Sequence, residues 1–163
     1  MKKFLLLLTM VFVFSLVCFS QRKTTVVGKY SYETECLGVE LDGSQTLRVW
    51  GTGRNQKDAV EQAKKNAVRE VLFKGIRGGE CEMKPLVPEV NADEKYESYF
   101  NKFFKDDGLY KFFATLQDER IPNRLLREKK ISRNSVTIPV VVRVQRAQLK
   151  EQMLQDGILN NNN

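Results

Sequence analysis

The sequence contains no histidine, and it has only three cysteines and one tryptophan in 163 residues. Without histidine, the chain lacks the commonest general base and the side chain that activates serine or cysteine in most hydrolytic triads. A zinc site of the usual cysteine and histidine type is disfavoured for the same reason. Acidic pairs such as Asp106-Asp107 stand beside turn or helix-end residues, where capping or solvated carboxylates are expected. We therefore predict that the protein is not an enzyme and has no cofactor.

The first 20 residues are typical of a secretory leader. Lys2 and Lys3 give a positive start, and the stretch from Phe4 to Phe19 is almost wholly apolar. Small residues then occupy the −3 and −1 positions of a cleavage site before Gln21. We expect the signal peptide 1–20 to be removed and the protein to be exported, to the periplasm or the periphery of the outer membrane.

Two alternatives to simple cleavage fit the residues less well. An uncleaved anchor needs roughly 20 apolar residues, whereas this run is shorter and is followed by Gln21-Arg22-Lys23. Lipid attachment at Cys18 is disfavoured because Val17 stands where a small residue is usual. We expect no lipid anchor and no membrane-spanning helix in the mature chain, although association with a membrane surface stays open.

Cys36 and Cys81 are the two cysteines outside the leader. In an oxidising compartment such a pair is a candidate disulfide. The alternative is that both are buried thiols, which act as small apolar residues. The sequence leaves both interpretations open.

The first part of the mature chain has the composition and periodicity of β-strands. The stretches 24–33 and 37–41 are rich in β-branched and aromatic residues, and Asp42-Gly43 then signals a hairpin turn. Over residues 47–53, Leu47, Val49 and Gly51 alternate with Arg48, Trp50 and Thr52. That period of two predicts a strand with one face on the core and one toward solvent.

A helix is expected next, with Asn55 as its N-cap. From Gln56 onward, small apolar residues recur at helical spacing while charged residues face away. The stripe consists of Ala59, Val60, Ala63, Ala67, Val68 and Val71. Its alanines would let the helix backbone lie close against a sheet, and Gly75 can end the helix in a left-handed turn.

The last third of the chain predicts a second hairpin and a short helix. Residues 124–131 and 135–144 are expected to pair around a turn at 132–134, with Pro139 at an edge or a bulge. A helix is expected over 146–155, before Gly157.

These elements predict a single α+β domain over residues 21–159. We expect a small, mostly antiparallel sheet of about four strands with one long alanine-striped helix packed on it. An aromatic helical insertion and a short C-terminal helix complete the domain. The asparagine run 160–163 is expected to be a disordered tail.

The segment between the long helix and the second hairpin is the most aromatic part of the chain. It follows a loop that runs from residue 78 to about 92, and its first rings have helical spacing. The rings either fill the core or, because they are so dense, leave some exposed as a partner-binding surface. The candidate residues are Tyr96, Tyr99, Phe100, Phe103, Phe104, Tyr110, Phe112 and Phe113.

The net charge of +7 and a cluster of basic residues suggest a second candidate, an anion-binding site. The candidate residues are Gly51, Gly53, Asn55, Arg124, Arg127, Lys129 and Lys130. The glycines precede a helix N-terminus, which favours anions, but Gln56 occupies the third glycine position of the dinucleotide fingerprint. Glu119 and Glu128 interrupt the basic cluster, so a solvated surface is the alternative, and no nucleic-acid partner is expected.

The stretch from Leu47 to Gly53, followed by Asp58 to Glu70, resembles the LPP-type bacterial envelope lipoproteins. The N-terminal domain of the flagellar assembly protein T is similar: a strand ends in glycine, a helix has alanine every fourth residue, and a late valine-rich strand returns beside it. The match covers about residues 46–76 and 135–145. The resemblance implies a scaffolding or assembly role at the envelope and transfers no catalytic residue.

Two functions from different classes follow from these observations. The first is a non-catalytic structural or assembly module that binds another envelope protein or a second copy of itself. The second is a periplasmic or outer-membrane-associated binder of an anionic ligand or polymer. Ionic strength separates them, because salt weakens anion binding steeply and an aromatic interface much less.

Overall fold

The computed structural model describes residues 34–118 and 120–160. The expected leader 1–20 with Cys18, the expected strand over 24–33 and residues 161–163 lie outside the described residues. The strands are β1 (Glu35–Val39), β2 (Gln45–Gly53), β3 (Gly78–Gly79), β4 (Ala114–Leu116), β5 (Lys130–Ser132) and β6 (Ser135–Val144). The helices are α2 (Gln56–Arg69), the π-helical turn η1 (Glu70–Lys74), α3 (Ala92–Lys95), α4 (Glu97–Phe103), α5 (Tyr110–Phe113), α6 (Asn123–Leu126) and α7 (Arg146–Gln155).

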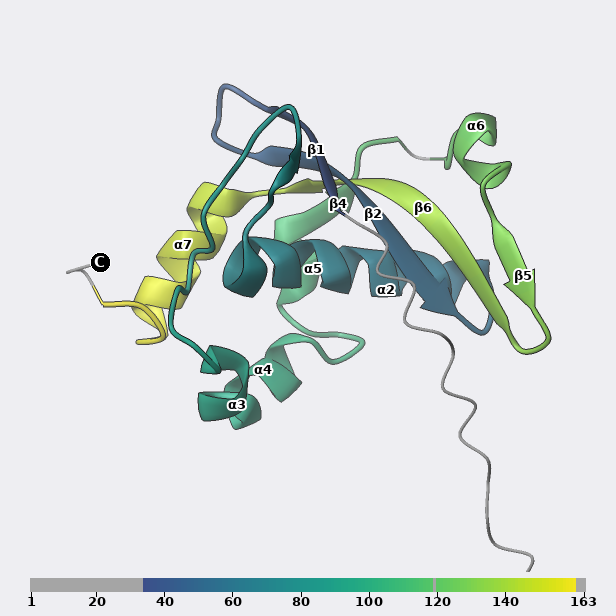
Figure 1. Ribbon diagram of the computed structural model, residues 1–163. Coiled ribbons are helices and arrows are strands. Elements are labelled where there is room, and N and C mark those ends of the chain that lie inside the picture. Colours follow the sequence, from purple (N-terminus) through teal and green to yellow (C-terminus); the bar gives the residue numbers. More distant parts are fainter. Residues whose placement is uncertain (1–33, 119, 161–163) are drawn as a thin grey trace, which may run out of the picture. The chain divides into compact units, whose positions relative to one another are not determined.

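The strands of the described ranges form one sheet in the order β3-β1-β2-β6-β4, and β5 also pairs with β6 (Figure 1). The central pair, β2 and β6, is antiparallel from Gln45 opposite Val144 to Gly53 opposite Val136. The pair β1 and β2 is also antiparallel, and only the two-residue β3 runs parallel to its neighbour. The predicted fold class, an α+β domain built on a mostly antiparallel sheet, is confirmed.

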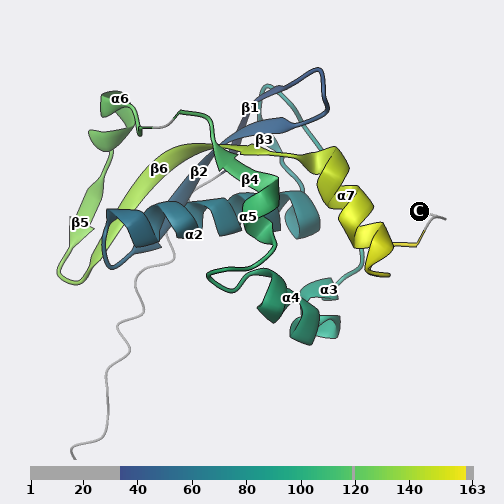
Figure 2. The same cartoon turned by 180° about the vertical axis from the view of Figure 1, so that it is seen from behind.

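The helix α2 lies across one face of the sheet (Figures 1 and 2). Asn55 caps it as predicted, because its side-chain oxygen accepts a hydrogen bond of 2.9 Å from the backbone N–H of Asp58. Ala59, Ala63 and Ala67 are fully buried against the sheet. The alanine stripe therefore faces the core.

The segment after α2 is tied back to the sheet by a disulfide between Cys36 and Cys81, whose Cα atoms are 5.4 Å apart. The backbone N–H of Glu80 also donates to the carbonyl of Cys36 at 2.8 Å. Gly75 directly follows η1 and has a positive φ of 72°, which glycine adopts without a side-chain clash. The predicted loop after residue 78 is therefore anchored to β1 near its start.

The aromatic insertion packs on the side of α2 that faces away from the sheet (Figure 2). The rings of Phe73 in η1 and Phe100 in α4 meet edge to face, with centroids 4.8 Å apart. The guanidinium of Arg69 lies 4.4 Å from the centroid of the Phe104 ring. The expected aromatic helix is present as α4, preceded by the short turn α3.

The first half of the second hairpin differs from the prediction. Residues 123–126 form the helical turn α6, and only residues 130–132 pair with β6 as β5. Leu125 explains the difference. Its side chain is buried, and the turn α6 that carries it contacts β6. A strand that extended away from the sheet would leave Leu125 exposed. Pro139 lies between the part of β6 that pairs with β5 and the part that pairs with β4. On this edge of β6 neither strand pairs with position 139, so the missing N–H of proline costs no ladder hydrogen bond. The helix α7 has the predicted bounds.

In the part of the chain that the structure describes, no helix combines the length and the apolar character needed to cross a bilayer.

Candidate functional site

Most of the aromatic candidates lie in the core and have little surface to offer a partner. Five rings are no more than 7% exposed: Phe100, Phe103, Phe104, Tyr110 and Phe113. Tyr96 and Tyr99 are half-buried and pack against the same core. The packing around α4 and α5 encloses these five rings, so they offer little surface, and partner binding by the aromatic segment stays a prediction.

Phe112 is different, because its ring is 71% exposed. It lies on α5 between Tyr110, which is fully buried, and Phe113, which stacks on Phe103 with a centroid separation of 6.0 Å. Leu109, one turn earlier, is 44% exposed. A helical turn anchored by two buried rings therefore presents an apolar pair, Leu109 and Phe112, to solvent. Leu109 was not among the sequence candidates, although its i, i+3 spacing to Phe112 places both side chains on one face of a helical turn.

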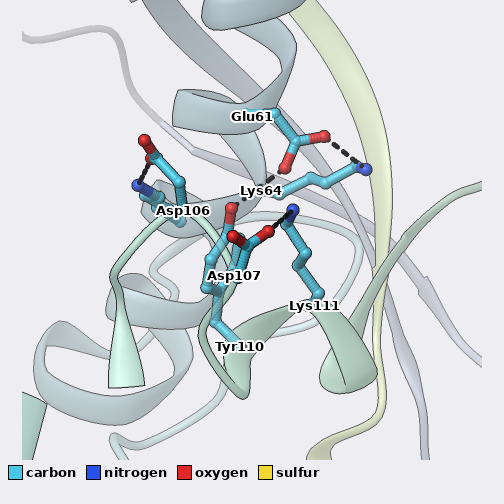
Figure 3. A network of polar contacts seen from close by, with 7 residues as sticks. Glu61, Lys64, Asp106, Asp107, Tyr110 and Lys111 are labelled. Atoms are coloured by element: carbon cyan, nitrogen blue, oxygen red, sulfur yellow. Dashed lines mark hydrogen bonds and ion pairs between the residues drawn. The ribbon is translucent and has the colours of Figure 1, made fainter. Parts of the chain in front are cut away.

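A polar cleft of about 490 Å³ adjoins this turn. It is lined by the end of β2, the first turns of α2 and the loop that leads into α5. Figure 3 shows its ionic network, in which Lys111 pairs with Asp107. The nitrogen–oxygen distance of this pair is 3.6 Å, and Lys65 pairs with Asp106 at 3.0 Å. Acidic and basic side chains line the cleft in equal number, so the cleft has no excess charge of one sign that would attract an ionic ligand.

Glu61 is the central carboxylate of this network. It accepts hydrogen bonds of 2.9 Å from the ammonium of Lys64 and of 2.9 Å from the phenol of Tyr110. Burial alone would raise the pKa of Glu61, but these two hydrogen bonds outweigh it and hold the pKa below its usual value. Glu61 is therefore an ionised acceptor at neutral pH.

The Tyr110 phenol is held in its protonated form. Burial raises its pKa well above the usual value, and the hydrogen bond to Glu61 raises it further. A phenol that stays protonated and donates to a fixed carboxylate is a structural link between α5 and α2. The carboxylate of Asp106 is likewise held ionised, because the hydrogen bond from Lys65 lowers its pKa.

The glycines of the expected anion site serve a packing role in the structure. A Cβ atom on Gly51 would lie 2.0 Å from the carbonyl oxygen of Ala59. A Cβ atom on Gly53 would lie 2.4 Å from the backbone nitrogen of Ala59. Asn55 accepts hydrogen bonds from two backbone N–H groups of the first helical turn. Its side-chain oxygen accepts from Asp58, and its backbone carbonyl accepts from Ala59. Anion binding at this turn stays a prediction, and the geometry accounts for all three residues without it.

The basic candidates lie on and after α6, apart from the glycine turn in sequence and on the other face of the sheet. Arg124, Arg127 and Lys130 are exposed, and Lys129 is half-buried. Lys130 places its ammonium 5.7 Å from the centroid of the Trp50 ring. Anion binding by these side chains is likewise untested and stays a prediction.

Arg48 lies beside Trp50 and the segment after α6, and it was not a sequence candidate. Its guanidinium pairs with Glu35 at 3.2 Å and with Glu128, and lies 5.9 Å from the Trp50 ring. Because Glu35 and Glu128 are far apart in sequence, no local pattern reveals that they share one cation. The ion pairs connect β1, β2 and the segment after α6.

Within residues 34–118 and 120–160, no group of three or more histidine, cysteine, aspartate or glutamate side chains is arranged to hold a metal ion. Comparisons of the chain with protein families, with curated proteins and with solved structures find no match.

Proposed function

We propose that this protein is an exported, non-catalytic binding module of the cell envelope, and that Phe112 and Leu109 are the centre of its contact with another envelope protein or a second copy of itself. The observation that carries the proposal is the exposure of Phe112, 71%, on a helical turn whose neighbouring rings are buried. Aromatic side chains at rigid surface positions are the commonest anchors of protein interfaces.

The surroundings of Phe112 support the same function. Lys111 and Asp107 flank the apolar pair and are themselves exposed. An apolar centre with a charged rim is the usual composition of a binding surface, in which the rim adds selectivity and the ring most of the affinity.

The non-catalytic part of the proposal is supported by the polar cleft. Its carboxylates Glu61, Asp106 and Asp107 are each paired with a lysine, and the Tyr110 phenol donates to one of them. Lowered pKa values hold Glu61 and Asp106 ionised, and a raised pKa holds the Tyr110 phenol protonated, whereas a general acid or base must change its protonation state during the reaction.

Export to the envelope is supported by the leader pattern of residues 1–20 and by the Cys36–Cys81 disulfide. Disulfides form and persist in oxidising compartments. The resemblance to envelope lipoproteins and to the flagellar assembly protein supports a scaffolding or assembly role. Intact mass tests the leader: we expect a chain that begins at Gln21, and a lipid adduct on a chain that begins at Cys18 would contradict it.

Site-specific photocrosslinking in cells tests the contact surface. A photoreactive phenylalanine analogue at position 112 should give a defined crosslinked product, whose mass identifies either a second copy or another envelope protein. The matched control is position 131, because Ile131 is also exposed, by 73%, but lies on β5. Absence of a product at position 112, or the same products from both positions, would reject the proposed surface.

A further inference from the structure

A groove of about 240 Å³ lies between the segment 85–88 and the helix α7, apart from the surface around Phe112. Its apolar lining includes Leu86, Leu154 and Leu159. Two cationic side chains, Arg146 and Lys150, also line it and lie one turn apart on α7. The groove is therefore apolar on one part of its surface and cationic on another.

Arg146 is half-buried, and its hydrogen bonds are incomplete. The Nη2 group donates to the backbone carbonyl of Lys84 at 2.9 Å. The Nη1 group is buried and has no hydrogen-bond partner among the described residues. Burial lowers the pKa of the guanidinium, yet an arginine stays charged at neutral pH. An unpaired buried donor on a charged group is costly, so a bound acceptor would remove an existing penalty.

The charge of the groove is not balanced by its own lining. Among the described residues, no acidic side chain lines the groove, and no ion pair involves Arg146 or Lys150. This distinguishes it from the cleft beside α5, where each lysine of the ionic network faces a carboxylate. The groove is complementary to a negative charge.

We propose that this groove binds a small amphipathic carboxylate, with its carboxylate on Arg146 and Lys150 and its hydrocarbon chain against the three leucines. The volume corresponds to about eight water-sized groups, which suits a saturated chain of roughly six to eight carbons. A carboxylate in the groove would pair with the cationic side chains of Arg146 and Lys150 through charge-assisted hydrogen bonds, which are stronger than neutral ones. This function is additional to the protein-binding role proposed above and uses different residues.

Titration of the disulfide-intact protein with sodium octanoate, below its micellar concentration, tests the proposal. Calorimetry should show saturable binding, and the amide resonances that shift should be those of residues 146–154 and 86. The neutral analogue 1-octanol should bind at least about tenfold more weakly, because it cannot pair with the two cations. Equal binding of octanol, or no saturable binding of octanoate, would overturn the proposal.

Charge variants locate the site. Lys150→Glu places an acid beside Arg146 at an exposed position that the fold tolerates, and it should weaken octanoate binding at least about tenfold. The matched control is Arg133→Glu, which makes the same charge change in the exposed turn before β6 and should leave the affinity within about twofold. Equal losses in the two variants would show that binding follows net charge and not this groove.

Two further measurements complete the test. Arg146→Lys keeps the charge but removes the planar donor, so it should bind octanoate more weakly than the wild type and more tightly than Arg146→Gln. If Arg146→Gln does not fold, the Lys150→Glu result decides. A dipeptide with a free C-terminal leucine that binds more tightly than octanoate would show that the groove recognises peptide ends, and it would overturn the proposed ligand.

Discussion

A Cβ atom on Gly51 would lie 2.8 Å from the Cβ atom of Ala63, so β2 and α2 approach each other closely at this point. Ala63 is fully buried, and the carbonyl of Ala59 is still closer to Gly51. The pairing of a strand glycine with a helix alanine fixes how near the helix can lie to the sheet. Glu61 lies between Ala59 and Ala63 on α2, so this close contact also positions Glu61 in the polar cleft.

We predict that enlarging either residue of this contact destabilises the fold. Ala63→Leu should lower the free energy of unfolding by about 1 to 3 kcal/mol, because the added carbons overpack the interface, and Gly51→Ala should act in the same direction. Urea denaturation measures both. The control is Ala147→Leu on α7, where the alanine is exposed and the change should be within about 0.5 kcal/mol. An unchanged midpoint for Ala63→Leu would mean that the helix can move away from the sheet without cost.

A second prediction concerns Gln45, whose side chain is fully buried at the start of β2. Neither its amide nitrogen nor its amide oxygen has a hydrogen-bond partner among the described residues. Because a buried unpaired polar group costs roughly 1 to 3 kcal/mol, Gln45→Leu should raise the free energy of unfolding by about 1 kcal/mol. Gln45→Glu buries a charge instead and should be strongly destabilising at neutral pH. Loss of stability in Gln45→Leu would reveal a partner for the amide.

The disulfide gives a third prediction. Its cysteines are 45 residues apart, and in the chain-entropy model a loop of this length stabilises by about 4 kcal/mol, although measured values are often smaller. The double variant Cys36→Ala, Cys81→Ala should therefore unfold at a clearly lower urea concentration. Thiol counting on the unfolded, unreduced wild type should find neither of these cysteines free. Two reactive thiols would contradict the bridge.

The features that could be predicted from the sequence are those that depend on local periodicity. The alanine stripe of α2, its Asn55 cap and the bounds of α7 each follow from a few neighbouring residues. The strand β6 was equally clear, because valine or isoleucine occupies every second position from Val136 to Val144. In these elements, local preference and tertiary packing favour the same structure.

The features that could not be predicted depend on contacts between distant residues. The hydrogen bond from Tyr110 to Glu61 joins residues 49 positions apart, so no local sequence pattern predicts it. The α6 turn adopts helical geometry because Leu125 packs on β6, whereas its local sequence reads equally well as a strand. Which rings of the aromatic segment are exposed is likewise decided by the packing of α4 and α5 on α2, and their spacing alone could not reveal it.

The fourth prediction concerns acid stability and Glu61. The folded state lowers the pKa of this carboxyl, so its contribution to stability is present above the unfolded pKa of about 4.3 and is lost as the pH falls through the folded value. Glu61→Gln should therefore be less stable than the wild type at pH 7, and the difference should shrink between pH 5 and pH 3. Tyr110→Phe removes one of the two hydrogen bonds and should reduce the same pH dependence in part. A constant difference at all pH values would show that Glu61 is not held ionised.

The last prediction compares two adjacent phenylalanines that the structure places in opposite environments. Phe113 is buried against Phe103, so Phe113→Ser should lower the free energy of unfolding by about 3 to 5 kcal/mol, as the loss of a core ring usually does.

Phe112 is exposed, so Phe112→Ser should change stability by no more than about 0.5 kcal/mol. If Phe112 is an interface anchor, the same substitution should weaken association with the crosslinked partner by about 2 kcal/mol, roughly thirtyfold in the dissociation constant, and added salt should change the affinity little. Urea denaturation and a binding titration on the same samples separate the two effects. A large loss of stability in Phe112→Ser would assign this ring to the core, whereas full binding by a stable variant would place the contact on another surface of the protein.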